Sequence, residues 1–348
     1  MIREIMAHAA PFVSPSQPKK VVYLFGAGAT HAELINVEPT ASEKVEERGL
    51  LMSNVSSRVI EKARHDSEYL NGVEMVSGTS GSLNIELLIS LIETSKLQDW
   101  ESKSKKLKAL VQEDILGILA SDVTAHFYLH KALFELHKQE TVKRQEQLLG
   151  LISLNYDSVV DQAYRSSFRR SPDYCLSLKR GATSGRGPHP LLKLHGSFDW
   201  RTSGVEVRSK TRKIDLIPLG TSKSYDHSPY VFIWSRAFEM LVECDTLRLI
   251  GCSLSQNDTH LIELLFKAQV ESGAGFDMEI IAPNKAGEDI RQTCGFFRQI
   301  QTLNELERGL VAETSPFSNP FKEWLRYKAD RMLREGVRQT RYLKEVHD

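Results

Sequence analysis

Apolar positions along this chain follow two different periods. Short segments rich in apolar residues, which are typical of buried strands, occur at residues 21–25, 149–154, 191–194, 214–219, 246–250 and 278–282. Segments with helical spacing lie between several of these runs, at residues 41–70, 231–242 and 260–268. Strands that alternate with helices predict a parallel sheet, so we expect an α/β fold with a Rossmann-like sheet.

One long segment departs from this alternation. Residues 83–145 contain almost no Pro or Gly and repeat apolar residues at helical spacing. One face carries Leu87, Leu88, Leu91 and Ile92, and another carries Leu107, Leu110, Ile115 and Leu119. We therefore expect a helical insertion at about residues 83–148, bordered by a Gly/Ser-rich loop at 72–82.

The expected domain organisation has three parts. Residues 1–18 are rich in Pro and predict a flexible arm, and residues 19–315 predict one α/β domain that contains the helical insertion. Residues 177–190 are expected to be a basic, Gly-rich loop, and residues 201–213 a polar excursion. Residues 316–348 are amphipathic and basic, which favours a docked C-terminal helical segment over a dedicated nucleic-acid contact.

Composition excludes several classes of protein. Lys plus Arg equals Asp plus Glu, at 45 each, so direct nucleic-acid binding is not expected. The four cysteines are scattered without a Cys-x-x-Cys pair, which argues against a disulfide framework and a cysteine zinc ribbon: Cys175, Cys244, Cys252 and Cys294. We see no membrane span and no signal-peptide core, so we expect a cytoplasmic protein.

A glycine turn follows the first predicted strand. Residues 26–31 read Gly-x-Gly-x-x-His, so the third glycine of the usual dinucleotide fingerprint is missing. Gly26 and Gly28 allow a tight turn and a close backbone approach, and the helix after them can face a phosphate with its positive end. An ordinary strand-to-helix turn explains the same residues equally well.

Polar or glycine residues recur where predicted parallel strands end. Gly26, Asn155, His195, Gly251 and Asn284 all lie at or just beyond such ends, which border the ligand crevice of an open α/β sheet.

Asn155 and Asp157 are two residues apart and project to one side of an extended backbone. They can hold a ribose hydroxyl, a carboxamide or a water, but Asp157 alone can also cap the next helix. His195 can accept a proton near neutral pH, although a lone histidine is often structural. His126 and His130 have a helical spacing without the Glu of a zincin motif, so no metal is expected.

Four motifs together resemble the sirtuin-like fold. They are residues 26–30 (Gly-Ala-Gly-Ala-Thr), 154–157 (Leu-Asn-Tyr-Asp), 193–197 (Lys-Leu-His-Gly-Ser) and 249–253 (Leu-Ile-Gly-Cys-Ser), the last with Asp258. The likeness spans about residues 21–284 and is closer to the bacterial sirtuin-like NAD hydrolases of antiphage defence than to protein deacetylases.

This resemblance implies that NAD is the substrate and that different residues of the site bind different parts of it. The pyrophosphate would lie at Gly26, Ala27, Gly28 and Thr30, near Gly251 and Ser253, with the adenosine end near Asn284. Asn155 and His195 would face the nicotinamide ribose as catalytic residues, and Asp157 would face the carboxamide. The implied reaction is hydrolysis of NAD to nicotinamide and ADP-ribose, with no metal.

Two departures from the family weigh against acyl-lysine chemistry. The four cysteines cannot reproduce the zinc module of the deacetylases, and the helical block has no place in a minimal sirtuin. His31 and Glu33 also depart from the usual continuation of the glycine turn. Transfer of ADP-ribose or an acyl group, and NAD sensing without turnover, remain alternatives. The resemblance to defence systems also implies a homo-oligomer with a partner ATPase or helicase.

Overall fold

A parallel sheet of seven strands forms the centre of the molecule. A computed structural model describes residues 17–37, 49–64, 84–96, 99–121, 127–142, 145–176, 186–198, 200, 225, 229–254, 258–306 and 319–334. The strands run in the order β3-β4-β2-β1-β5-β6-β7, and every pair is parallel. Their bounds are β1 Lys19–Phe25, β2 Glu146–Ser153, β3 Ser171–Asp173, β4 Arg186–Lys193, β5 Thr246–Ile250, β6 Asp277–Ile281 and β7 Gln299–Thr302.

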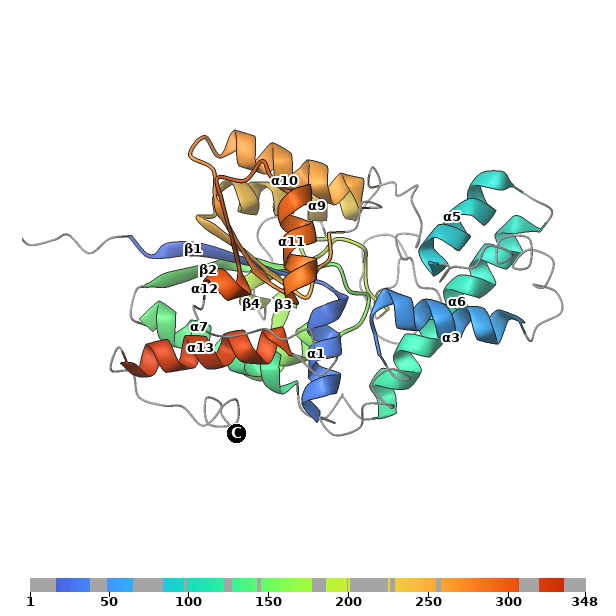
Figure 1. The fold of residues 1–348 in the computed structure, drawn as a ribbon, viewed down its shortest axis with the longest axis horizontal. Helices are drawn as coiled ribbons and strands as arrows, with labels where there is room; N and C mark the ends of the chain where they lie inside the picture. The colour runs from blue at the N-terminus through green and yellow to red at the C-terminus, as the bar shows by residue number, and fades with distance from the viewer. Residues whose placement is uncertain are drawn as a thin grey trace, which may run out of the picture.

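Helices cover both faces of this sheet (Figure 1). One face packs against α1 Ala27–Val37, α7 Tyr128–Val142, α8 Val159–Phe168 and α13 Pro320–Arg334. The other packs against α9 Tyr230–Val242, α10 Thr259–Glu271 and α11 Asn284–Thr293, while α12 Leu303–Leu306 is a short turn after β7. Successive residues of β1 alternate between the two cores, because side chains of a strand point to opposite faces: Tyr23 joins the first core and Leu24 the second. This confirms the predicted α/β class.

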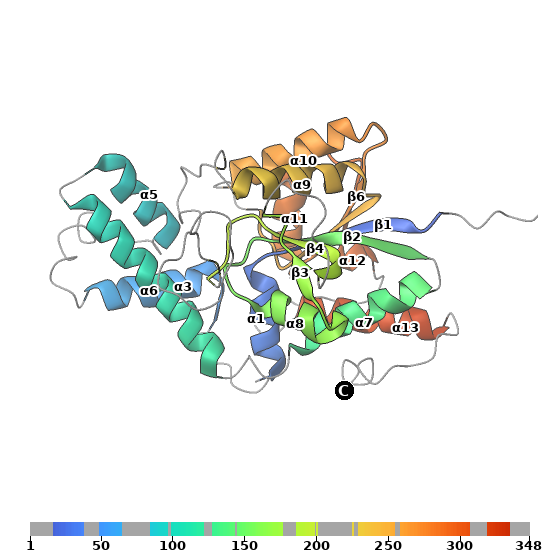
Figure 2. The ribbon, with the colours of Figure 1, turned by 180° about the vertical axis from the view of Figure 1, so that it is seen from behind.

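Three helices form a separate module beside the sheet. They are α3 Met52–Arg64, α5 Ile85–Ser95 and α6 Trp100–Ser121, and Figures 1 and 2 show them at one end of the molecule. They share a small core that includes Val59, Leu88 and Leu107, and Tyr156 and Phe198 of the main body join it. Within the described part of residues 83–145 the expected helical character is confirmed by α5, α6 and α7 Tyr128–Val142. Helix α7 within that segment packs on the sheet with α8 and α13.

The sequence misplaced the starts of two strands. Strand β2 begins at Glu146, within the helical insertion that was expected to reach residue 148. Residues 186–190 were expected to belong to a loop, but β4 begins at Arg186 and pairs there with the short edge strand β3. Gly and Pro residues hide this strand in the sequence, and Tyr164 supports it by exchanging hydrogen bonds with the backbone of His189. Residues 1–16, 72–82, 177–185, 201–213 and 214–219, for which an arm, loops, an excursion and a strand were expected, lie outside the described residues.

The described part of the C-terminal segment, α13 Pro320–Arg334, docks as an amphipathic helix. Phe321, Trp324, Leu325 and Ala329 of α13 are buried against the sheet and α7. Spacing of three and four residues places them on one helical face, as the sequence predicted. Within the described residues, no helix combines the length and the apolar character that crossing a membrane requires.

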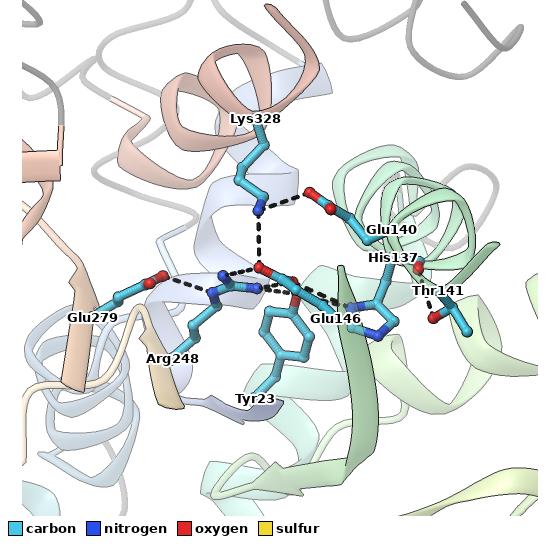
Figure 3. A network of polar contacts seen from close by, with 8 residues as sticks. All are labelled: Tyr23, His137, Glu140, Thr141, Glu146, Arg248, Glu279 and Lys328. Carbon is cyan, nitrogen blue, oxygen red and sulfur yellow. Dashed lines mark hydrogen bonds and ion pairs between the residues drawn. The ribbon is translucent and has the colours of Figure 1, made fainter. Parts of the chain in front are cut away.

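A buried polar network lies between the sheet and the helices α7 and α13 (Figure 3). Arg248 of β5 donates to Glu279 through Nε (2.6 Å) and to Glu146 through Nη2 (2.6 Å). Its Nη1 also donates to the hydroxyl of Tyr23, at 2.9 Å. Burial opposes ionisation of Glu146, but the charges of Arg248 and Lys328 outweigh it and hold the pKa of Glu146 well below its usual range. The network therefore links β2, β1, β5 and β6 through charged hydrogen bonds.

Helix α13 joins the same network through Lys328. Its Nζ contacts Glu140 at 3.0 Å and Glu146 at 3.2 Å, so it connects α13 to α7 and to the sheet. His137 of α7 lies beside it, with Nδ1 at 3.3 Å from the hydroxyl of Tyr23. Burial lowers the pKa of His137 to about 3, so this histidine is neutral in the folded protein.

Candidate functional site

The site lies where the connections of the sheet diverge. The chain leaves β1 into α1 on one face, and it leaves β5 into α10 on the opposite face. Since β1 and β5 are neighbours, their two outgoing turns separate at the carboxyl edge of the sheet. Open α/β sheets bind ligands in the crevice that forms at such a switch in direction.

The two glycine turns at this point touch each other. The amide of Gly28 donates to the carbonyl oxygen of Gly251 at 2.8 Å. An added Cβ at Gly28 would lie 2.8 Å from Gly251 backbone atoms, and one at Gly26 would lie 2.6 Å from the Gly251 oxygen. Gly251 itself has φ +60°, a conformation that favours glycine. The glycines are therefore required by backbone contact between the turns, and the amide of Gly28 is not available to a phosphate.

A cavity of about 450 Å³ opens beside these turns. The predicted site residues that line it are Gly26, Ala27, Gly28, Thr30, Asn155, Asp157, His195, Gly251 and Ser253. Asn284 is not among the lining residues; it begins α11 directly after Pro283, which does line the cavity. Ligand cavities in proteins commonly have volumes of about 300–1,000 Å³, so the space suits a small molecule.

Part of the cavity wall comes from the helical module. Met52 and Val55 of α3, Glu86 of α5 and Ile115 of α6 line it opposite the sheet edge. The sequence indicated a helical insertion but assigned none of these residues to the site. Their approach depends on packing between distant segments, for which no local pattern gives a signal.

Asn155 is held by two hydrogen bonds. Its Nδ2 donates to the carbonyl oxygen of Gly26 at 2.9 Å and to the hydroxyl of Thr30 at 3.0 Å. An amide nitrogen has two protons, so both are used inside the protein. The Asn155 Oδ1 is then the atom of this side chain that can accept a hydrogen bond from a ligand hydroxyl or a water.

Asp157 connects the same turn to helix α8. Its Oδ1 accepts from the amide of Val159 at 2.9 Å, and its Oδ2 accepts from the Thr30 hydroxyl at 3.0 Å. The capping role considered from the sequence is thus present, although Asp157 also lines the cavity. Burial raises the pKa of Asp157, while Lys193 and the two hydrogen bonds oppose this shift.

His195 follows β4 and lies across the cavity. It is only 5 % exposed, and its ring centroid lies 6.1 Å from that of Tyr156. The Nε2 atom is 3.8 Å from Oδ1 of Asp258, the residue that precedes α10. Asp258 makes no side-chain capping bond to α10, and it is one of the residues that line the cavity.

The cavity carries carboxylates close to its aromatic residues. Burial raises the pKa of Tyr156 well above its usual value, and the charges of Glu86 and Asp258 raise it further. Tyr156 therefore stays neutral near neutral pH. The sequence did not assign Tyr156 or Glu86 to the site; Asp258 appeared only within the family motif.

His130 has a structural role. Its Nδ1 lies 2.7 Å from Oε1 of Glu33, and the same carboxylate accepts the amides of Leu129 and His130 at the start of α7. Glu33, which departs from the family pattern, therefore caps α7. His126 lies outside the described residues, and among those described no three His, Cys, Asp or Glu side chains gather as a metal would require.

Comparisons with known proteins give a likeness in structure alone. No family model and no curated protein matches the sequence. A mutant Sir2 homologue in complex with 2′-O-acetyl ADP-ribose matches with a TM-score of 0.43 and 13 % identity, covering 92 % of this chain and 95 % of that chain. A second Sir2 homologue mutant, in complex with ADP-ribose, matches with a TM-score of 0.42 and 16 % identity over 92 % of this chain and 95 % of that chain. A Sir2 structure with the inhibitor EX-527 matches with a TM-score of 0.40 and 12 % identity over 91 % of this chain and 94 % of that chain. The chain is similar to Sir2 structures at low identity and low TM-score, and the functional proposal rests on the geometry of the cavity.

Proposed function

We propose that the cavity binds NAD and hydrolyses the bond between nicotinamide and ribose, giving nicotinamide and ADP-ribose. The observation that carries this proposal is the meeting of three features in one cavity: the glycine turns at the switch between β1 and β5, Asn155, and His195. A nucleotide needs a place for its phosphates, and the reaction needs an oriented water with a base beside it.

The dinucleotide would lie along the carboxyl edge of the sheet. Its pyrophosphate would face the start of α1 at Gly26, Ala27 and Thr30, where the helix end is positive, with Ser253 opposite. The Gly28 amide is hydrogen-bonded to Gly251 and so would not bind the phosphates. Gly28 would instead allow the ligand to approach the backbone closely, because glycine has no Cβ. The adenosine end would extend toward Asn284.

The reaction breaks the bond between ribose C1′ and the nicotinamide nitrogen. The bonding electron pair leaves with nicotinamide, which becomes neutral, and positive charge develops on the ribose. Water adds to C1′ and loses one proton, which His195 would accept while Asn155 Oδ1 orients the water or a ribose hydroxyl. The carboxylates of Glu86 and Asp258 would stabilise the developing positive charge.

NAD turnover by the purified chain tests this proposal. Chromatography should show nicotinamide and ADP-ribose formed in equal amounts without an added acceptor. Nicotinamide release only with a protein or acyl-lysine acceptor would indicate a transferase, and saturable binding without product would indicate a sensor. Either result would overturn the hydrolase proposal.

The cellular role is a further part of the proposal. On the resemblance to antiphage NAD hydrolases, this chain would be the NAD-depleting effector of a defence system, working as a homo-oligomer with a partner ATPase or helicase. Exposed Leu87 and Leu91 lie one turn apart on α5 and offer an apolar contact for assembly. Light scattering of the isolated chain should show an oligomer. A monomer with full turnover and no toxicity in cells would contradict this role.

A further inference from the structure

A buried lysine lies directly behind the site. Lys193, the last residue of β4, is 0 % exposed, although it follows two leucines in an apolar strand. Lysine is almost never fully buried unless its charge is paired. Here the Nζ atom donates to Asp161 Oδ2 at 3.1 Å, to Ser197 Oγ at 2.8 Å and to the carbonyl oxygen of Asp157. These three acceptors use all three protons of the ammonium group.

The three acceptors come from different parts of the site. Asp157 ends the turn that carries Asn155, and Ser197 ends the turn that carries His195. Asp161 belongs to the first turn of α8, where its other oxygen accepts from the hydroxyl of Tyr174 at 2.5 Å. One ammonium group thus contacts both strand-end turns and the helix behind them.

Backbone bonds between the turns depend on this arrangement. The amide of Phe198 donates to the carbonyl oxygen of Tyr156 at 2.8 Å, and the hydroxyl of Ser197 reaches the same oxygen at 3.3 Å. These two hydrogen bonds therefore connect the turn of residues 155–157 directly to the turn of residues 196–198. A shift of either turn would change the distance between Asn155 and His195.

We propose that Lys193 is a positioning residue, whose ammonium group fixes the turn of Asn155 relative to the turn of His195. This inference rests on the proposed function for the roles of those two residues. Lys193 does not touch the cavity, so it would act on turnover through geometry while leaving binding of the dinucleotide nearly unchanged. Positional errors of about 1 Å can reduce turnover about 100-fold.

The test separates this role from simple stabilisation of the fold. Lys193→Met alone leaves Asp161 charged and buried, so it should lower the unfolding midpoint as well as turnover. The double variant Lys193→Met/Asp161→Asn removes both charges and should unfold at a higher midpoint than Lys193→Met alone. We expect its kcat to stay about 100-fold below wild type, with KM changed by less than about threefold.

A matched control removes a different buried lysine. Lys328→Met also breaks contacts with two carboxylates, Glu140 and Glu146, but in the network under α7 and α13. It should lower stability without lowering kcat. A second readout that needs no activity is hydrogen exchange at the Phe198 amide, which should lose protection in the double variant while the amide of Leu24 in β1 does not.

Each outcome decides the question. Wild-type kcat in the double variant, or unchanged protection of the Phe198 amide, overturns the positioning role. If the double variant does not fold, Ser197→Ala decides instead, since it keeps both charges and removes one acceptor; wild-type kcat in that variant overturns the role. If the wild-type chain does not cleave NAD, the proposed function fails, and exchange at Phe198 alone decides whether Lys193 holds the turns together.

Discussion

Gly28 and Gly251 are joined by a backbone hydrogen bond of 2.8 Å, although they follow different strands and more than two hundred residues separate them. The bond ties the start of α1 to the turn after β5. Both turns line the cavity, so the wall of the site is built from their direct contact.

The first prediction concerns the Gly251 turn. A Cβ at Gly251 would lie 2.1 Å from the amide nitrogen of Ala29, and the residue has φ +60°. Gly251→Ala should therefore lower the free energy of unfolding by more than about 2 kcal/mol. Gly273→Ala is the matched control, because Gly273 has φ +68° but no atom of the described residues lies within 4 Å of an added Cβ. Urea unfolding of both variants separates the steric clash at Gly251 from the backbone strain that both positions share. Equal losses of unfolding free energy in the two variants would contradict the clash.

The second prediction separates the two proposed catalytic residues. His195→Ala should reduce NAD turnover by about 10²–10⁴-fold while keeping the fold, as expected for loss of a general base. Asn155→Ala should lose turnover and also about 1–3 kcal/mol of stability, because the Gly26 carbonyl and the Thr30 hydroxyl lose their buried donor. Turnover, calorimetric NAD binding and urea unfolding should be measured on both. His260→Ala on the exposed surface of α10 is the control, and wild-type turnover in His195→Ala would remove His195 as the base.

The third prediction concerns acid stability. Burial lowers the pKa of His137 to about 3, whereas an unfolded histidine titrates near 6.5. Between these two pKa values the folded state therefore binds fewer protons at His137 than the unfolded state does. The contribution of neutral His137 to stability is complete above about pH 6.5 and is lost as the pH falls below that value. His137 alone should contribute a loss of about 2 kcal/mol between pH 7.5 and pH 5.

His137→Gln tests this pH dependence. The variant should show a smaller drop in the free energy of unfolding between pH 7.5 and pH 5 than the wild type. Burial lowers the pKa of His31 and His189 to about 4 each, so part of the drop should remain. An unchanged drop would mean that His137 does not titrate between the folded and unfolded states.

The fourth prediction uses a glycine inside helix α6. Among the described residues no atom would lie within 4 Å of an added Cβ at Gly117, and glycine weakens a helix interior relative to alanine. Gly117→Ala should raise the free energy of unfolding by about 1 kcal/mol. Gly273→Ala, with equal open space but positive φ, should change stability in the opposite direction. A loss of stability in Gly117→Ala would indicate that a partner or an undescribed segment approaches α6 there.

The sequence predicted the sheet because its strands are buried on both faces. Short segments rich in apolar residues that end in glycine or polar residues, such as residues 21–25 before Gly26, are typical of such buried strands. Strand β3 has three residues and β7 has four, which is too short for a period to appear. The start of β4 was missed because Gly187, Pro188 and Pro190 are typical of loops.

Only those residues of the site that lie at strand ends could be predicted from the sequence. Asn155 and His195 follow neighbouring parallel strands, so the topology brings them to one edge. Glu86 reaches the cavity from the helical module, and that approach depends on packing that no local pattern encodes. Lys193 left a signal, a charge inside an apolar strand, but its three partners became visible only in the fold.

The position of β1 in the sheet has a consequence for synthesis of the protein. This strand is made early, yet one of its neighbours is β5; Arg248 of β5 contacts Tyr23 of β1 across 225 residues. A ribosome that adds about 5–20 residues per second needs roughly 10–45 s to cover that separation. Throughout this time one edge of β1, whose last five residues are apolar and buried, has no partner, so the nascent chain can pair with other chains. Expression at low temperature with abundant chaperones should therefore increase the yield of soluble protein more than a change of buffer does.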